Sequence, residues 1–338
     1  MEERHAAANV APPHAFDFGT QALALLANPL NVEVIRAHAT GPLRLSRLQE
    51  QMGWVSQSSL RVTIRSLRDI DILMPQPLAG APYAVVNELT RAGTEMLLLA
   101  DGLDAWLARA PGGPIEPGSN TAKTVVKALA GGWDSNIVRT LASQPLTLTE
   151  LARSIPDVSY PSLERRLTSM RIAGQLEPVT QPGRGTPYAA TEWLRRSSGL
   201  LCQAARWEQL HMHGRAAGIT GTGIETVLLL AIRLPLPLPE SAGGQCLLAT
   251  PGGPDDIGEP ALSGITVEVQ GGKVVSAVDA IDRAPPNWAL GTPEGWLDAI
   301  LDGGVETLRT GGVDSPLAVN LAQAVHLALF KDQIFHST

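Results

Sequence analysis

One stretch of the chain occurs twice, and it constrains the fold more than any other feature. The first copy, VSQSSLRVTIRSLRD, runs from Val55 to Asp69, and the second, VSYPSLERRLTSMRI, runs from Val158 to Ile172. Each opens with a serine whose hydroxyl can accept a hydrogen bond from a free amide at a helix N-terminus. Apolar residues then recur at i, i+4 and i+7, which predicts a short helix with one buried face in each copy: Leu60, Ile64 and Leu67, then Leu163, Leu167 and Met170.

The repeat extends beyond these two helices. An offset of 103 residues relates further identical residues on both sides of them: Arg36 and Arg139, Pro42 and Pro145, Leu48 and Leu151, Pro75 and Pro178. In the segment that follows, Tyr83 and Tyr188 match at an offset of 105 residues. A nearly constant offset over this length indicates a tandem duplication. We therefore expect a loose tail at residues 1–19, one copy at 20–110, a Pro/Gly-rich linker at 111–120, a second copy at 121–214 and a further domain at 215–338.

The face opposite the apolar one is basic in both predicted helices. A helix that is apolar beneath and basic above fits the major groove of DNA, whereas the plainer alternative is a solvated surface helix. Arg184 lies between glycines at the tip of the second predicted hairpin, where an arginine suits a phosphate or minor-groove contact or is an ordinary surface residue. The candidate DNA-binding residues are Ser58, Arg61, Arg65, Tyr160, Arg165, Arg166 and Arg184.

The two copies differ at several of these positions. Arg61 of the first copy is replaced by Glu164 in the second, and the first hairpin tip carries no charge where the second carries Arg184. We therefore expect unequal half-sites, with the second copy making the stronger contact to the DNA backbone through its hairpin.

The charge of the chain is unevenly distributed. The formal net charge is −7. Residues 20–215 carry 20 Lys and Arg against 16 Asp and Glu, a net of +4, whereas residues 216–338 carry 5 against 14, a net of −9. The positive charge thus lies with the two copies, where phosphate contacts would need it. The acidic C-terminal part is a poor nucleic-acid binder and is expected to have another role.

The predicted order within each copy is helix, short strand, helix, turn, helix, β-hairpin and helix, which is that of a winged helix. The first copy resembles the HxlR-type branch of bacterial winged-helix transcription regulators in GPLRLSRLQEQM, VSQSSLRVTIRSLRDIDIL and PYAVVNELTRAG. The second copy carries the resemblance in GGWDSNIVRTLASQPLTLTELARSI, VSYPSLERRLTSMRI and TPYAATEWLRRS, and Gly131-Gly132-Trp133 is expected to open the counterpart of the first helix.

Typical members of that family have one winged helix and work as homodimers, so the duplication is a departure from the family pattern. The resemblance implies that the end helices, which carry Trp106 and Trp207, form an interface. The two copies would then pack as an intramolecular pseudo-dimer. The alternative is that each tryptophan belongs to the core of its own copy.

The part that follows residue 214 is richer in glycine and proline, and its alternating β-branched residues predict strands. It resembles the sterol-carrier-protein type of lipid-binding fold in VQGGKV, ALGTPEGWLDAILDG and TLRTGG. That resemblance implies a sheet with helices over an apolar cavity. The candidate ligand-binding residues are Leu247, Val267, Val269, Trp288, Trp296, Ile300, Leu321 and Val325, which would otherwise fill a core.

Several classes of function lack their motifs in this sequence. We find neither a nucleophile elbow nor a phosphate-binding loop, and His211 and His213 have no further metal ligands at suitable spacing. We therefore expect no enzymatic activity, no cofactor and no metal. Two cysteines are too few for a disulfide framework, which favours a reducing cytoplasm. The longest apolar run is interrupted by Arg233 and by prolines, so no membrane span is expected.

The expected fold class is α+β, with two tandem winged helices followed by an α/β lipid-carrier-like domain. The expected function is a cytoplasmic, bacterial-type transcription regulator that binds double-stranded DNA and is modulated by a hydrophobic small molecule. It would act as a monomeric pseudo-dimer or as a homodimer. The rival hypothesis is a protein that does not bind DNA and that sequesters or processes a hydrophobic metabolite, with the winged helices as a scaffold.

Overall fold

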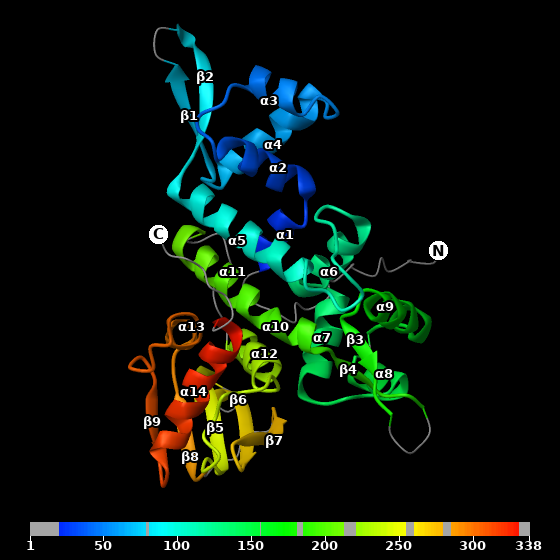
Figure 1. Ribbon diagram of the computed structural model, residues 1–338, viewed down its shortest axis with the longest axis vertical. Coiled ribbons are helices and arrows are strands. Elements are labelled where there is room, and N and C mark those ends of the chain that lie inside the picture. Colours follow the sequence, from blue (N-terminus) through cyan, green and yellow to red (C-terminus); the bar gives the residue numbers. More distant parts are fainter. Residues whose placement is uncertain are drawn as a thin grey trace, which may run out of the picture.

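The computed structural model describes residues 20–78, 81–155, 157–180, 185–212, 221–254, 260–279 and 285–330. We call residues 20–107 unit 1, residues 120–211 unit 2 and residues 221–330 the C-terminal unit. Figure 1 shows an elongated molecule with the hairpin of unit 1 at one end and the sheet of the C-terminal unit at the other. None of the described helices is long and apolar enough to cross a membrane.

Unit 1 consists of five helices and one hairpin. Its elements are α1 (Thr20–Leu26), α2 (Pro29–His38), α3 (Leu45–Gln51), α4 (Gln57–Asp69), β1 (Leu73–Leu78), β2 (Ala81–Leu89) and α5 (Arg91–Leu107). Ser56 caps α4, as expected, because its side chain accepts a hydrogen bond from the Ser59 amide. Leu43 forms an antiparallel bridge with Asn87, which ties the segment before α3 to the hairpin.

Unit 2 repeats this order of elements. They are α6 (Asn120–Ala130), α7 (Trp133–Ser143), α8 (Leu148–Ser154), α9 (Tyr160–Ile172), β3 (Leu176–Pro178), β4 (Tyr188–Ala190), α10 (Glu192–Arg196) and α11 (Ser198–His211). Two expectations need correction. Trp133 opens the counterpart of α2 and not of the first helix, a position that α6 takes. Ser159 makes no side-chain capping bond to α9.

The hairpins correct the expected register of the repeat. Leu73 pairs with Leu89 in unit 1, and Leu176 pairs with Ala190 in unit 2. The offset is thus 103 residues before the hairpin and 101 residues after it, so that the first hairpin is the longer one. Tyr188 bridges Leu146 and so takes the place of Asn87, not of Tyr83. The two tyrosines match in type but lie at different levels of their hairpins.

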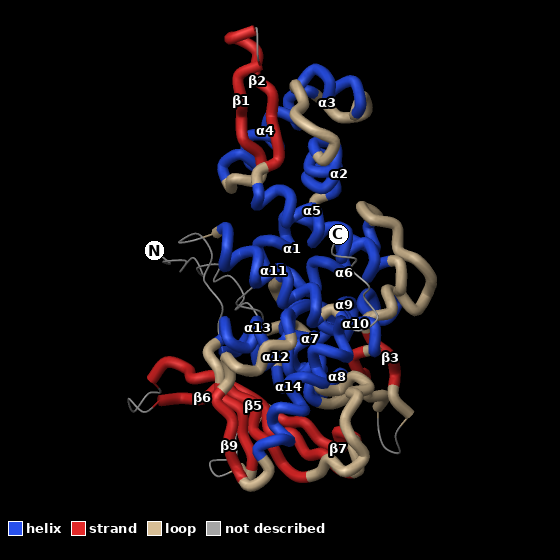
Figure 2. Tube along the Cα trace, turned by 60° about the vertical axis from the view of Figure 1, so that its left-hand side comes forward, coloured by secondary structure: helices blue, strands red, loops and turns tan. Residues whose placement is uncertain are grey.

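The C-terminal unit is a mixed sheet with three helices. Its elements are α12 (Gly221–Ala231), β5 (Gly244–Pro254), β6 (Pro260–Gln270), β7 (Lys273–Val278), β8 (Asn287–Leu290), α13 (Pro293–Asp302), β9 (Arg309–Gly312) and α14 (Ser315–Phe330). The strand order is β7-β6-β5-β8-β9, and β5 runs parallel to β8 while the other pairs are antiparallel. Figure 2 shows this sheet at the end of the molecule remote from β1 and β2. Kinship with sterol carrier proteins stays a prediction.

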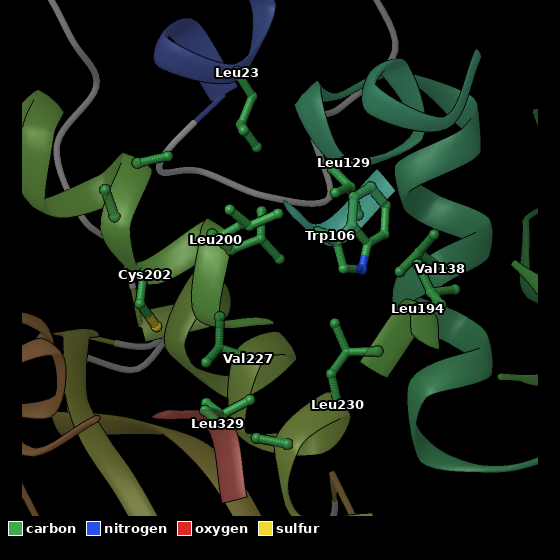
Figure 3. Close-up of a cluster of buried hydrophobic side chains, with 14 of the residues drawn as sticks. Leu23, Trp106, Leu129, Val138, Leu194, Leu200, Cys202, Val227, Leu230 and Leu329 are labelled. Carbon is green, nitrogen blue, oxygen red and sulfur yellow. The ribbon is translucent and has the colours of Figure 1, made fainter. Parts of the chain in front are cut away.

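The three units share one apolar core. Figure 3 shows side chains from all of them in one cluster, with Leu23 on α1, Trp106 on α5, Leu200 on α11, Leu230 on α12 and Leu329 on α14. All five are buried. Burial of apolar surface is the dominant favourable contribution to folding, so the units are held together by the same force that folds each of them.

Two arginines join unit 2 to the C-terminal unit at the end of α7. Arg195 donates to the carbonyl oxygens of Ala142 (3.1 Å) and Leu229, and Arg233 donates to those of Ser143 (2.8 Å) and Ala277 (3.0 Å). The last carbonyls of a helix lack intrahelical partners, which these guanidinium groups supply. Burial lowers the pKa of Arg195 to about 10, with a contribution from the nearby charge of Arg233.

Candidate nucleic-acid interface

Helix α4 presents a polar, basic face to solvent. Leu60, Ile64 and Leu67 are buried against unit 1, which confirms the predicted apolar face. Arg61 and Arg65 are exposed on the other side of the helix. Since neither arginine forms an ion pair or a side-chain hydrogen bond with another described residue, both can contact a ligand of opposite charge.

The flanks of α4 are fixed by local hydrogen bonds. Ser56 bonds through its hydroxyl to the hydroxyls of Ser58 (2.9 Å) and Ser59 (2.8 Å), so that Ser58 is exposed but held in place. At the other end, Arg68 donates from Nε to the Asn87 side chain of β2 at 2.7 Å. Arg68 therefore links the helix to the hairpin, while Arg61 and Arg65 do not.

Helix α9 divides the predicted residues of unit 2 into two groups. Tyr160 and Arg165 are exposed, as a contact residue must be. Arg166 is half-buried, and its guanidinium lies 2.6 Å from the Asp134 carboxylate of α7. This ion pair places Arg166 between α9 and α7, away from the exposed face. Arg184 lies outside the described residues.

Two exposed apolar residues of unit 1 were missed by the sequence reasoning. Trp54, in the turn between α3 and α4, is 71% exposed, and Val62, on α4, is 69% exposed. Apolar residues scattered singly over a surface are common, but Val62 follows Arg61 directly on the exposed face of α4. Val62 is an apolar residue that lies outside the i, i+4, i+7 series of the buried face. Its position in the sequence could therefore have identified it as exposed.

The family comparison concerns this part of the chain. Residues 25–111 match the model of the HxlR-like helix-turn-helix family. Unit 1 contains an HxlR-like helix-turn-helix domain. The match runs from the end of α1 to just past α5 and thus includes α3, α4 and the hairpin. No curated protein matches the chain.

An HxlR-like domain implies DNA binding and transcription regulation, so the exposed face of α4 is the candidate nucleic-acid interface. Its helix-turn-helix consists of α3, the turn at Trp54 and α4. In such a motif the second helix enters the major groove with its N-terminal residues near the base edges. Ser58 and Arg61 lie in the first two turns of α4, and Arg65 follows one turn after Arg61 on the same exposed face.

The predicted ligand-binding residues of the C-terminal unit do not converge on one side of the sheet. Val267 lies opposite Cys246, and both are fully buried. Leu247 follows Cys246 and therefore points to the other face, the face that it shares with its parallel partner Trp288. Hence Leu247 and Trp288 cannot line the same cavity as Val267 and Val269.

The helical members of that set are buried in the core. Trp296 and Ile300 on α13, and Leu321 and Val325 on α14, are at most 1% exposed. The Trp296 indole donates to the Ala249 carbonyl oxygen at 2.9 Å. These contacts are those of packed core residues, so an apolar ligand in this unit stays a prediction.

The largest cleft that we describe lies elsewhere, between unit 2 and the C-terminal unit. It has a volume of about 450 Å³, and Trp133, Arg139, Glu225 and Asp279 contribute to its walls. Arg139 pairs with Glu225 across it at 3.3 Å, and Ser263 donates to the same carboxylate at 2.8 Å. None of the eight predicted ligand-binding residues lines this cleft.

Proposed function

We propose that the chain is a DNA-binding transcription regulator in which units 1 and 2 act as an intramolecular pseudo-dimer of winged helices. The HxlR-like match to unit 1 supports the DNA-binding part of the proposal. The repeated element order, and the equivalent bridges Leu43–Asn87 and Leu146–Tyr188, support a second winged helix in unit 2.

The observation that carries the pseudo-dimer is a pair of reciprocal hydrogen bonds between the end helices. Trp106 of α5 donates from Nε1 to the carbonyl oxygen of Trp193, and Trp207 of α11 donates from Nε1 to that of Ala92, each at 2.9 Å. Residues 106 and 207, like residues 92 and 193, are related by the offset of 101. A two-fold dimer makes each contact twice in this way, because residue i meets residue j and residue j meets residue i.

Further contacts extend the same interface. Helices α5 and α11 lie side by side (Figure 1), and α1 packs on both α6 and α11. The Glu208 carboxylate accepts a hydrogen bond from the Ala22 amide at 2.7 Å, and His211 lies 2.6 Å from Glu95. These polar contacts connect residues more than 100 positions apart, which supports the packing of two units as two subunits would pack.

The test is a mobility-shift titration of the full-length chain with duplex fragments from upstream of its own gene. Sedimentation of the complex would count the chains per duplex. We expect one chain per duplex, two protected half-sites about one helical turn apart, and an affinity that falls as salt rises. The double variant Arg61→Ala, Arg65→Ala should lose binding, whereas Arg309→Ala, which removes an exposed arginine of β9, should retain it.

Two outcomes would contradict the proposal in different ways. Two chains on each pair of half-sites would mean that the protein dimerises between chains and not within one. A failure to bind any duplex, with an intact fold by circular dichroism, would favour the rival hypothesis of a scaffold that does not bind DNA.

A further inference from the structure

The two candidate recognition helices can be compared residue by residue. Helices α4 and α9 both have 13 residues, and an offset of 103 relates every position of one to the other. The centre of the exposed face of α4 is formed by residues 58, 61, 62 and 65, which are spaced to lie along one stripe of a helix. We call these residues the reading stripe of α4, and residues 161, 164, 165 and 168 the reading stripe of α9.

The reading stripe of α4 alternates basic and apolar groups. Val62 lies between Arg61 and Arg65 in the stripe, and all three side chains are exposed. Arginine pairs with the O6 and N7 acceptors of guanine, and an aliphatic side chain contacts the methyl group of thymine. The methyl groups of Val62 are exposed to solvent and would become buried on contact with a thymine methyl group.

The reading stripe of α9 has a different chemistry. Glu164 takes the place of Arg61, Arg165 that of Val62, and Thr168 that of Arg65, and all three are exposed. Within the described part of the chain we find no ion pair that involves Glu164. A carboxylate is repelled by phosphates, but within the major groove it can accept a hydrogen bond from the N4 amino group of cytosine.

We propose that the two helices read different bases, α4 guanine and thymine through Arg61, Val62 and Arg65, and α9 a cytosine through Glu164 beside a guanine through Arg165. The recognised DNA is then a pair of dissimilar half-sites in a fixed order. This inference rests on the proposed function, because it assumes that both helices enter the major groove. Glu164 and Val62 are its specificity-determining residues.

The first test concerns Glu164. Sites are selected from a random duplex pool with the full-length chain and with Glu164→Gln. Glutamine pairs with adenine where glutamate accepts from cytosine, so the variant should change the preferred base at one position of one half-site from cytosine to adenine. The other half-site should be unchanged. Ser66→Ala, an exposed change outside the stripe on α4, is the matched control and should select the wild-type site.

The second test concerns Val62 and uses a selected duplex in which thymines of the first half-site are replaced by deoxyuridine. Removal of the methyl group that Val62 contacts should weaken binding by the wild-type chain about fourfold, as expected for one buried methyl group. Val62→Ser, which replaces the two methyl groups with a hydroxyl, should bind the two duplexes equally well.

The outcomes separate the inference from the function on which it rests. If the chain selects a defined site, but Glu164→Gln selects the same cytosine, the inference is wrong while the DNA-binding function stands. Symmetric half-sites would also overturn the inference. If no duplex is enriched at all, both the inference and the proposed function fail.

Discussion

Trp106 and Trp193 exchange hydrogen bonds across the junction of units 1 and 2. The Trp106 indole donates to the Trp193 carbonyl oxygen at 2.9 Å, and the Trp193 indole donates to the Trp106 carbonyl oxygen at 2.8 Å. The two rings are stacked with centroids 4.3 Å apart. Both side chains are buried, so the pair fixes the end of α5 against α10.

This pair predicts a coupled loss of stability. Trp106→Phe and Trp193→Phe each leave one buried carbonyl without its indole donor, which should lower the free energy of unfolding by about 1–3 kcal/mol. The double variant should lose less free energy of unfolding than the sum of the two single losses, because each single change already disturbs the stacking between the two rings. Urea denaturation measures the free energy of unfolding of the two single variants and of the double variant. Trp54→Phe, which changes an exposed tryptophan, is the control. Strictly additive losses would show that the two residues act independently.

The repeat and the helices could be predicted from sequence because their signals are local. Apolar spacing identified Leu60, Ile64, Leu163 and Leu167 as buried, and all four are. The bounds of α4 and α9 differ by the same 103 residues that relate Leu48 to Leu151. The helices depend only on residues a few positions apart, and the repeat appears when the sequence is compared with itself.

The remaining errors come from contacts between distant residues. Tyr83 and Tyr188 match in type, but strand pairing with Leu43 and Leu146 decides which residues are equivalent. Positions 165 and 166 are both arginine, yet among the described residues only Arg166 has an acid from another helix, Asp134, beside it.

The same limit explains why the predicted ligand-binding residues of the strands lie on both faces of the sheet. Alternation along β5 tells that neighbouring side chains point in opposite directions. It does not tell how β5 and β6 are aligned, and the register that pairs Val267 with Cys246 is what separates Leu247 from Val267.

Asp71 provides a test of equivalence between the units. It is the one non-glycine residue with positive φ (60°) in the described part of the chain, and its counterpart Gly174 has a φ of 80°. Because this region is unfavourable for side chains with a Cβ, Asp71→Gly should raise the free energy of unfolding by about 1 kcal/mol. Gly174→Ala should lower it, since the added Cβ would lie 3.1 Å from Pro111. Thermal and urea unfolding would check both, and a destabilised Asp71→Gly would contradict the equivalence.

Arg165 and Arg166 should respond differently to the same change. Arg165→Ala removes an exposed group of the reading stripe and should weaken binding to the selected duplex by about 1–3 kcal/mol, with stability unchanged. Arg166→Ala leaves Asp134 unpaired and should lower the free energy of unfolding by about 1 kcal/mol, after allowance for the partial exposure of the pair. Binding titrations and urea denaturation of each variant form the test. Equal losses of affinity would place Arg166 at the DNA.

His38 should make the stability of the protein fall in mild acid. Its Nδ1 donates to the Val34 carbonyl oxygen at 2.7 Å, and its Nε2 is buried with no partner among the described residues. Burial lowers the pKa of His38 below its ordinary value, because a charged ring could not be solvated there, although the bond to Val34 opposes the shift. As the pH falls below about 6.5, the unfolded chain takes up a proton that the folded chain does not. The unfolded state is then favoured and the free energy of unfolding decreases.

The histidine can be isolated by substitution. His38→Asn keeps a donor for the Val34 carbonyl and removes the titrating ring, so its free energy of unfolding should change less between pH 7 and pH 5 than that of the wild-type chain. Since the chain has 7 histidines, the difference between the two slopes is the quantity to measure, by urea denaturation at several pH values. The cost of the substitution itself is measured at pH 7, where His38 is mostly neutral in both states, and is subtracted from the change between pH 7 and pH 5. Identical slopes would mean that the ring is protonated in the folded protein, with solvent reaching Nε2.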